Sequence, residues 1–190
     1  MSSHPAEPFA ERFDEVLRDA VAGSEDAHAD LFGELAPAVA GYLRARGAHD
    51  PDDLANEVFL RAFRVLHTFR GDAGRFRSWI FTIARNCLID ERRRAARRPS
   101  LVVLPDAEPV EHAIDAETEA LARLAHERVT ELLARVSPNQ RDVLMLRIVA
   151  DLSVEQTATV LGKTSEAVKA LTRRGLAALE RELLRQGVSR

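Results

Sequence analysis

The sequence predicts an all-α protein built from two small helical domains. Apolar residues recur at helical spacing along the chain, helix-capping residues separate these stretches, and no stretch is typical of a strand. We expect a first domain at residues 24–98 and a second at residues 120–185, joined by a flexible acidic linker at residues 99–119. Residues 1–23 are expected to be an extension with a short amphipathic helix, and residues 186–190 a tail.

The stretch Ser153 to Leu179 predicts a helix-turn-helix motif. Ser153 and Gln156 form a capping box, Gly162 can adopt the left-handed conformation that ends a helix, and Thr164 can cap the next helix. In this motif the second helix enters the major groove of DNA. An ordinary helical hairpin is the alternative, but the agreement of caps, turn glycine and core positions favours the motif. The outer face of the second helix should carry Ser165, Glu166, Lys169, Thr172 and Arg173.

Composition narrows the class of protein. The 190 residues are 46% hydrophobic and include one cysteine, which excludes an internal disulfide and a multi-cysteine zinc site. No apolar run could cross a bilayer and no signal peptide is present, so we expect a cytoplasmic protein without membrane insertion or cofactor. The net charge is −3, yet five arginines fall within residues 92–98, while residues 99–122 contain no lysine or arginine. The negative net charge argues against nucleic-acid binding, but the local cluster of arginines favours it.

Residues 50–66 predict a helix with sharply defined ends. Asp50 is a suitable N-cap and Pro51 suits the first helical position. One face is apolar, and the opposite face is polar and charged. The pattern alone is also consistent with an ordinary solvated surface. The polar face carries Asp53, Asn56, Glu57, Arg61 and Arg64.

After an expected loop at residues 67–75, a helix with an apolar back and a basic front follows. Trp79 and Cys87 lie on the apolar side, so we expect both to be core residues. Cations near a helix C-terminus also favour the helix dipole, but five arginines in seven residues exceed that need and favour polyanion binding. The exposed polar residues include Arg85, Asn86, Arg92 and Arg93.

The second domain should begin with a helix from about Ala120 to Val136, followed by a second capping box at Ser137 and Gln140. The LVVL run inside the linker has no evident role.

Three motifs now carry a resemblance to a family. DPDDLANEVFLRAFR, FRSWIFTIARNCLIDERRR and SPNQRDVLMLRIVADLSVEQTATVLGKTSEAVKALTRR occur in this order. Together they resemble the extracytoplasmic-function (ECF) sigma factors of bacterial RNA polymerase, the small sigma-70 proteins that keep the second and fourth conserved regions. The resemblance covers both domains, roughly residues 24–98 and 120–185.

The resemblance implies partners and site residues. It implies core RNA polymerase, through its β′ clamp helices and its β subunit, promoter DNA, and an anti-sigma factor. The clamp helices would contact Asp53, Asn56, Glu57 and Arg61, with Asn56 standing where the family usually has glutamine. The −10 promoter element would contact Arg85, Asn86, Arg92 and Arg93, and the −35 element Ser165, Glu166, Lys169, Thr172 and Arg173. Ala170 and Leu171 replace a common Ser-Arg pair, which alters the expected −35 contacts.

The leading hypothesis is therefore a non-catalytic alternative sigma factor that directs polymerase to a set of promoters. The second hypothesis is a conventional helix-turn-helix regulator that acts without replacing the sigma subunit. This hypothesis assigns no function to the basic helix of the first domain. An enzyme is disfavoured because the six histidines show no metal-ligand spacing and no phosphate-binding loop or nucleophile motif is present.

Overall fold

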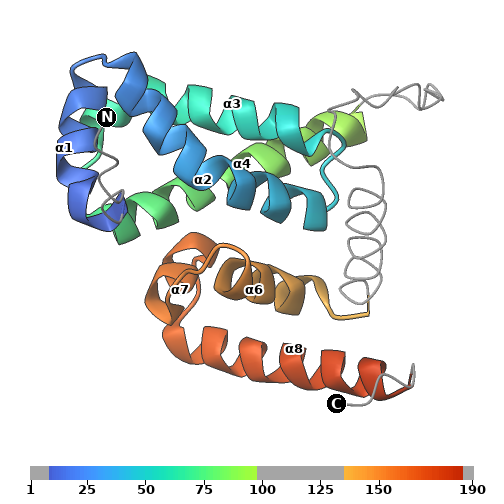
Figure 1. The fold of residues 1–190 in the computed structure, drawn as a ribbon. Helices are drawn as coiled ribbons and strands as arrows, with labels where there is room; N and C mark the ends of the chain where they lie inside the picture. Colours follow the sequence, from blue (N-terminus) through green and yellow to red (C-terminus); the bar gives the residue numbers. More distant parts are fainter. Residues whose placement is uncertain (1–8, 98–134, 186–190) are drawn as a thin grey trace, which may run out of the picture.

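The computed structural model describes residues 9–97 and 135–185 (Figure 1). Within these two ranges the regular structure is helical and no strand occurs, which confirms the predicted all-α class. The linker, the helix expected from about Ala120, the first eight residues and the tail lie outside the described residues.

The N-terminal helices begin and end close to the predicted positions. They are α1 (Phe9–Val21), α2 (Glu25–Ala45), α3 (Pro51–Arg64), the short 3₁₀ helix η1 (Leu66–Thr68) and α4 (Ala73–Arg97). The α2 helix continues past Pro37. As predicted, Asp50 caps α3: its side chain accepts a hydrogen bond from the backbone N–H of Asp53 at 2.9 Å.

The α4 helix starts earlier than the sequence analysis expected. The sequence predicts a loop at residues 67–75, but η1 occupies part of that segment and α4 begins at Ala73. The reason is local, because Oδ1 of Asp72 accepts a hydrogen bond from the backbone N–H of Arg75 at 2.7 Å. This contact satisfies a free donor of the first helical turn, and it makes Asp72 the N-cap.

Aromatic side chains form the centre of the N-terminal core. Phe13 from α1 is 1% exposed and packs on Phe76 of α4, with ring centroids 5.4 Å apart. Phe69, which lies between η1 and α4, contacts both Phe76 and Trp79. As predicted, Cys87 is fully buried, and burial raises the pKa of its thiol. The aromatic cluster thus fixes the segment before α4 against α1.

The C-terminal helices are α6 (Pro138–Ile148), α7 (Val154–Leu161) and α8 (Ser165–Arg185). Both predicted capping boxes are present, at Ser137 with Gln140 and at Ser153 with Gln156. Gly175 lets α8 approach α6 closely, because a Cβ atom there would lie 2.9 Å from Cδ1 of the buried Leu144.

The C-terminal helices pack against the N-terminal ones (Figure 1). The α7 helix contacts α4, and α6 contacts α2. A Cβ atom at Gly74 would lie 2.8 Å from Nε2 of Gln156, so only glycine fits this approach without movement. Arg77 of α4 donates a hydrogen bond to the backbone carbonyl of Ala150 at 3.2 Å.

Candidate nucleic-acid interface

The helix-turn-helix motif forms as predicted. Gly162 ends α7 with a φ of 60°, in the left-handed region that glycine adopts without strain. The hydroxyl of Thr164 then accepts a hydrogen bond from the backbone N–H of Ala167 at 3.2 Å and caps α8. Val168 is fully buried and anchors α8 against the other helices. These contacts fix the angle at which α8 presents its outer face.

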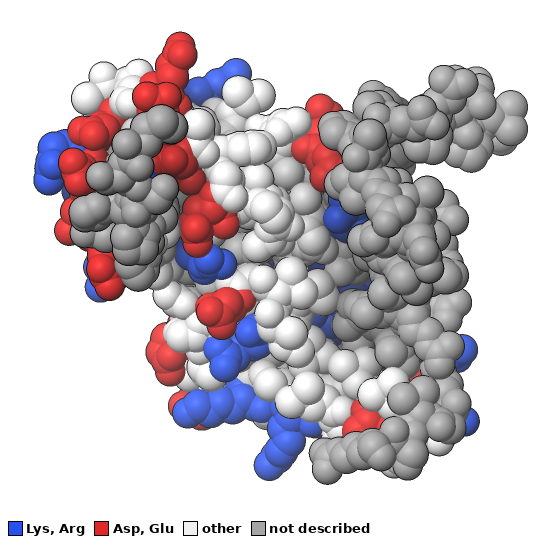
Figure 2. All heavy atoms as spheres, in the orientation of Figure 1, with Lys and Arg blue, Asp and Glu red and all other residues white. Residues whose placement is uncertain are grey.

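The structure gathers the predicted −35 residues on one exposed side of α8. Their positions repeat at helical spacing, so they share a face. Glu166, Lys169 and Arg173 are exposed, whereas Ser165 and Thr172 are half-buried. Figure 2 shows lysine and arginine atoms gathered along α8. Exposed cations on a helix after a tight turn can bind phosphates and guanine edges.

Of the four predicted polymerase-binding residues of α3, two are exposed and two are half-buried. Asp53 and Asn56 are exposed near the start of the helix. Glu57 and Arg61 are about one-third exposed, and they form an ion pair one turn apart on the same helix. The structure therefore brings all four residues together on the polar face of α3.

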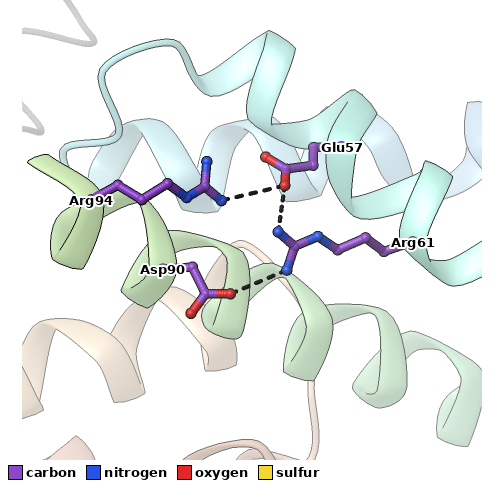
Figure 3. Close-up of polar contacts among 4 residues, drawn as sticks. All are labelled: Glu57, Arg61, Asp90 and Arg94. Carbon is purple, nitrogen blue, oxygen red and sulfur yellow. Dashed lines mark hydrogen bonds and ion pairs between the residues drawn. The ribbon is translucent and has the colours of Figure 1, made fainter.

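Glu57 and Arg61 also take part in an ion-pair chain that links α3 to α4 (Figure 3). Arg61 contacts Asp90 of α4 at 3.2 Å, and Arg94 of α4 contacts the same Glu57 oxygen at 3.4 Å. The hydrogen bond to Glu57, and after it the one to Asp90, raises the pKa of the Arg61 guanidinium. Negative and positive side chains alternate along this series of ion pairs, which holds the Glu57 carboxylate in one place. The motif comparison missed Asp90 and Arg94, although both lie in the predicted basic helix.

The predicted −10 residues of α4 differ in exposure. Asn86 and Arg93 are exposed, as expected. Asn86 lines an open pocket of about 380 Å³ together with Arg61, Arg64, Val65 and Ile83. A pocket with an amide, two guanidinium groups and apolar walls has the chemistry to hold a nucleobase. The pocket lies beside the polar face of α3, because Arg61 lines it.

Arg85 and Arg92 lie close enough to Asp142 of α6 to act on its charge. Arg85 is half-buried, whereas Arg92 is exposed and donates a hydrogen bond to the backbone carbonyl of Arg46, the residue that follows α2. Arg46 in turn forms an ion pair with Asp142 of α6, and the two side chains are only 10% and 13% exposed. Burial raises the pKa of the Asp142 carboxyl, while Arg46, Arg85 and Arg92 act in the opposite direction. Sequence reasoning missed Arg46 and Asp142, because no motif joins them.

Other kinds of site find no support in the part of the chain that the structure describes. Across residues 9–97 and 135–185 no group of histidine, cysteine and carboxylate side chains could hold a metal ion. No helix in those two ranges is both long and apolar enough to cross a bilayer.

Two family models match the chain, one over the N-terminal helices and one over the C-terminal helices. Residues 31–98 match sigma-70 region 2, and residues 126–179 match sigma-70 region 4. The chain is 32% identical to the ECF RNA polymerase sigma factor BldN of Streptomyces coelicolor, over 94% of this chain and 68% of BldN. It is 33% identical to the ECF RNA polymerase sigma factor SigD of Mycobacterium tuberculosis, over 93% of this chain and 86% of SigD.

The chain belongs to the ECF RNA polymerase sigma factors.

Solved structures support the same family. This ECF sigma factor is similar to CnrH in its complex with the cytosolic domain of CnrY, with a TM-score of 0.67 and 27% identity. That likeness covers 92% of this chain and 97% of CnrH. The sigma factor RpoE of Bartonella quintana, in complex with the anti-sigma factor NepR, shares the fold at a TM-score of 0.58 and 22% identity. The predicted family and the alternative-sigma-factor function are confirmed.

Proposed function

We propose that this ECF sigma factor uses separate surfaces for core polymerase, the −10 element and the −35 element. Residues 24–98 would be region 2 and residues 120–185 region 4, joined by the acidic linker. The protein would act in the cytoplasm as a non-catalytic specificity subunit. The two family-model matches, in this order and on separate helical groups, support this division.

The polar face of α3 is proposed to bind the β′ clamp helices of the polymerase through Asp53, Asn56, Glu57 and Arg61. All four residues lie on one face, and the first two are exposed. Asp90 and Arg94 would position Glu57 and Arg61 through the ion pairs of Figure 3 rather than contact the polymerase themselves. Region 4 would contact the β subunit.

The −10 element is proposed to bind along α4. A base of the non-template strand would leave the stack and enter the pocket beside Asn86, whose amide can form hydrogen bonds with a base edge. Unstacking costs a few kcal/mol, so the pocket must return a similar amount in contacts. Arg85, Arg92 and Arg93 would bind the neighbouring phosphates.

The −35 element is proposed to bind the outer face of α8. Lys169 and Arg173 are exposed and would contact guanine, because a lysine or arginine can donate to its O6 and N7 acceptors. Ser165, Glu166 and Thr172 would complete the contacts. Thr172 already donates its hydroxyl hydrogen to the backbone carbonyl of Val168 at 2.9 Å, so its contact with DNA would run through the methyl group or a lone pair.

An anti-sigma factor is proposed as a further partner. The similar CnrH is seen bound to the cytosolic domain of a second protein, CnrY. On this chain α3 leaves Leu60 59% exposed and Val65 follows it at 43%, next to the proposed polymerase-binding face. A partner that covers these apolar side chains would also block core polymerase.

Paired alanine variants test the division of labour. Asp53→Ala with Glu57→Ala should lose core polymerase binding and keep −35 recognition by the C-terminal helices. Lys169→Ala with Arg173→Ala should do the reverse, because these cations lie on a different surface. The matched control is Glu180→Ala with Arg181→Ala, two exposed residues further along α8. If both test pairs gave the same defect, the division would be wrong.

A further inference from the structure

Glu155 lies in the first turn of α7, the first helix of the helix-turn-helix motif, and it has no part in the proposed DNA contacts. Its side chain is exposed, yet hydrogen bonds fix its position. Oγ of Ser153 donates a hydrogen bond to Oε2 of Glu155 at 3.0 Å and accepts one from the backbone N–H of Gln156 at 3.1 Å. The hydroxyl that caps α7 therefore also holds the Glu155 carboxylate.

Two cations from the neighbouring helices lie near this carboxylate. The pKa of Glu155 is lowered first by a hydrogen bond from its own backbone N–H and then by the Ser153 hydroxyl. Lys169 of α8 and Arg147 of α6 act in the same direction. Arg147 is itself held by a hydrogen bond to the backbone carbonyl of Leu152. The helices α6, α7 and α8 thus bring three charged side chains together, and one of them is a proposed guanine contact.

Lys169 is attracted to Glu155 without being engaged by it. Within residues 9–97 and 135–185, Lys169 forms no ion pair of 4.0 Å or less. Its three ammonium donors therefore stay free for the acceptors of a guanine. A lysine is a compact charge on a flexible stem, and a nearby phosphate attracts it as well as a base edge does. A fixed anion beside it restricts where the ammonium lies.

The place of Glu155 in the motif also sets its effect on the DNA backbone. The first helix of a helix-turn-helix crosses the backbone while the second lies in the major groove. A carboxylate in the first turn of α7 therefore lies near phosphates, repels them and competes with them for the Lys169 ammonium. Phosphate contacts carry no sequence information, so this repulsion weakens binding to every sequence equally. The contact between Lys169 and guanine then accounts for a larger share of the affinity.

We propose that Glu155 is a positioning residue for −35 recognition, which holds the Lys169 ammonium toward the base that it reads and disfavours binding to phosphates alone. Glu155 would thereby set how strictly one position of the −35 element is read, without touching a base itself. The inference rests on the proposed function, since it deepens the assignment of the outer face of α8 to the −35 element.

The first test measures base preference in the holoenzyme. The full-length chain and bacterial core polymerase would select duplexes from a random-sequence library, and Lys169→Ala would identify the position that Lys169 reads. Glu155→Gln removes the charge and keeps an oxygen for the Ser153 hydrogen bond. It should reduce the preference at that position about two- to fivefold, the range for an exposed charge pair, and spare the other positions. The matched control Glu180→Gln removes a charge from an exposed site on α8 and should spare every position.

The second test asks whether Glu155 acts through Lys169. Fluorescence anisotropy would give the Kd of the holoenzyme for an enriched duplex and for a scrambled duplex of the same composition. Glu155→Gln should lower the ratio of the two affinities about two- to fivefold. In a Lys169→Ala background the same change should leave the ratio unaltered, because the side chain that it positions is absent. An equal loss in both backgrounds would overturn the proposal.

The outcomes separate this inference from the proposed function. If the wild-type holoenzyme enriches a −35 sequence and Lys169→Ala alters one position that Glu155→Gln leaves unchanged, the positioning role alone is wrong. If Glu155→Gln weakens all positions alike and lowers the melting temperature, Glu155 has a structural role and the proposal is overturned. If the wild-type holoenzyme enriches no sequence, the proposed function is wrong and the inference falls with it.

Discussion

Phe13 links the N-terminal helix α1 to the part of the molecule that is proposed to open promoter DNA. Its ring is 1% exposed and lies 5.4 Å from Phe76 and 6.5 Å from Phe69, measured between centroids. Phe69 in turn packs on Trp79 of α4. Removing the Phe13 ring should therefore loosen α1 and also the segment that leads into α4.

The expected cost of Phe13→Ala follows from its complete burial. Truncation of a buried phenylalanine costs about 3–5 kcal/mol, which combines lost transfer free energy with the cavity that remains. Domains of this kind are stable by about 5–15 kcal/mol in total. A loss of about 3 kcal/mol lowers the melting temperature of a 60–100-residue unit by about 12–24 °C. Thermal unfolding followed by circular dichroism would measure this shift.

Phe32→Ala is the matched control, because it removes the same ring from α2 at a position that is 37% exposed. Phe32 contacts Phe59 at 4.8 Å between centroids, so we expect a loss of about 1 kcal/mol. If Phe13→Ala melted within a few degrees of the wild type, α1 would not belong to the core, and the role assigned to it would be wrong.

Four further predictions concern other parts of the structure. Asp90→Asn removes a partner of the α3 ion-pair chain and should weaken core polymerase binding about two- to fivefold in a titration, the range for an exposed pair. Gly162→Val places a β-branched side chain at a φ of 60°. The free energy of unfolding of the C-terminal helices, measured by thermal unfolding, should fall by about 1–2 kcal/mol. Cys87 should react with iodoacetamide at neutral pH only after unfolding, because it is fully buried and the pKa of its thiol is raised. Gly41→Cys with Val149→Cys should form an intramolecular crosslink on oxidation, since a Cβ atom at Gly41 would lie 3.5 Å from the Val149 side chain; failure to crosslink would contradict the packing of α6 on α2.

Local features were predictable because they follow from short-range chemistry. The two capping boxes, the Asp50 cap and the left-handed Gly162 each depend on residues within four positions of one another. The outer face of α8 was likewise predictable, because helical spacing decides which residues share a face. The start of α4 differs from the prediction because it depends on the Asp72 cap, which lies before the apolar pattern of the helix begins.

Long-range packing could not be predicted in the same way. Nothing near Asp142 in the sequence indicates that it meets Arg46 about a hundred positions earlier. For the same reason Arg85, which we expected to be free for DNA, is half-buried beside the second group of helices. The ion-pair chain of Figure 3 also joins two helices whose polar faces look independent in the sequence.

Promoter specificity for core RNA polymerase is the central function of this ECF sigma factor. The direct measurement is reconstituted transcription, with purified protein, bacterial core polymerase and promoter fragments from the source genome. We predict transcripts that start at discrete sites only when the protein is present, and that are lost with Asp53→Ala and Glu57→Ala. Binding to duplex DNA without transcripts, and without co-elution with core polymerase, would contradict the account and favour a conventional helix-turn-helix regulator.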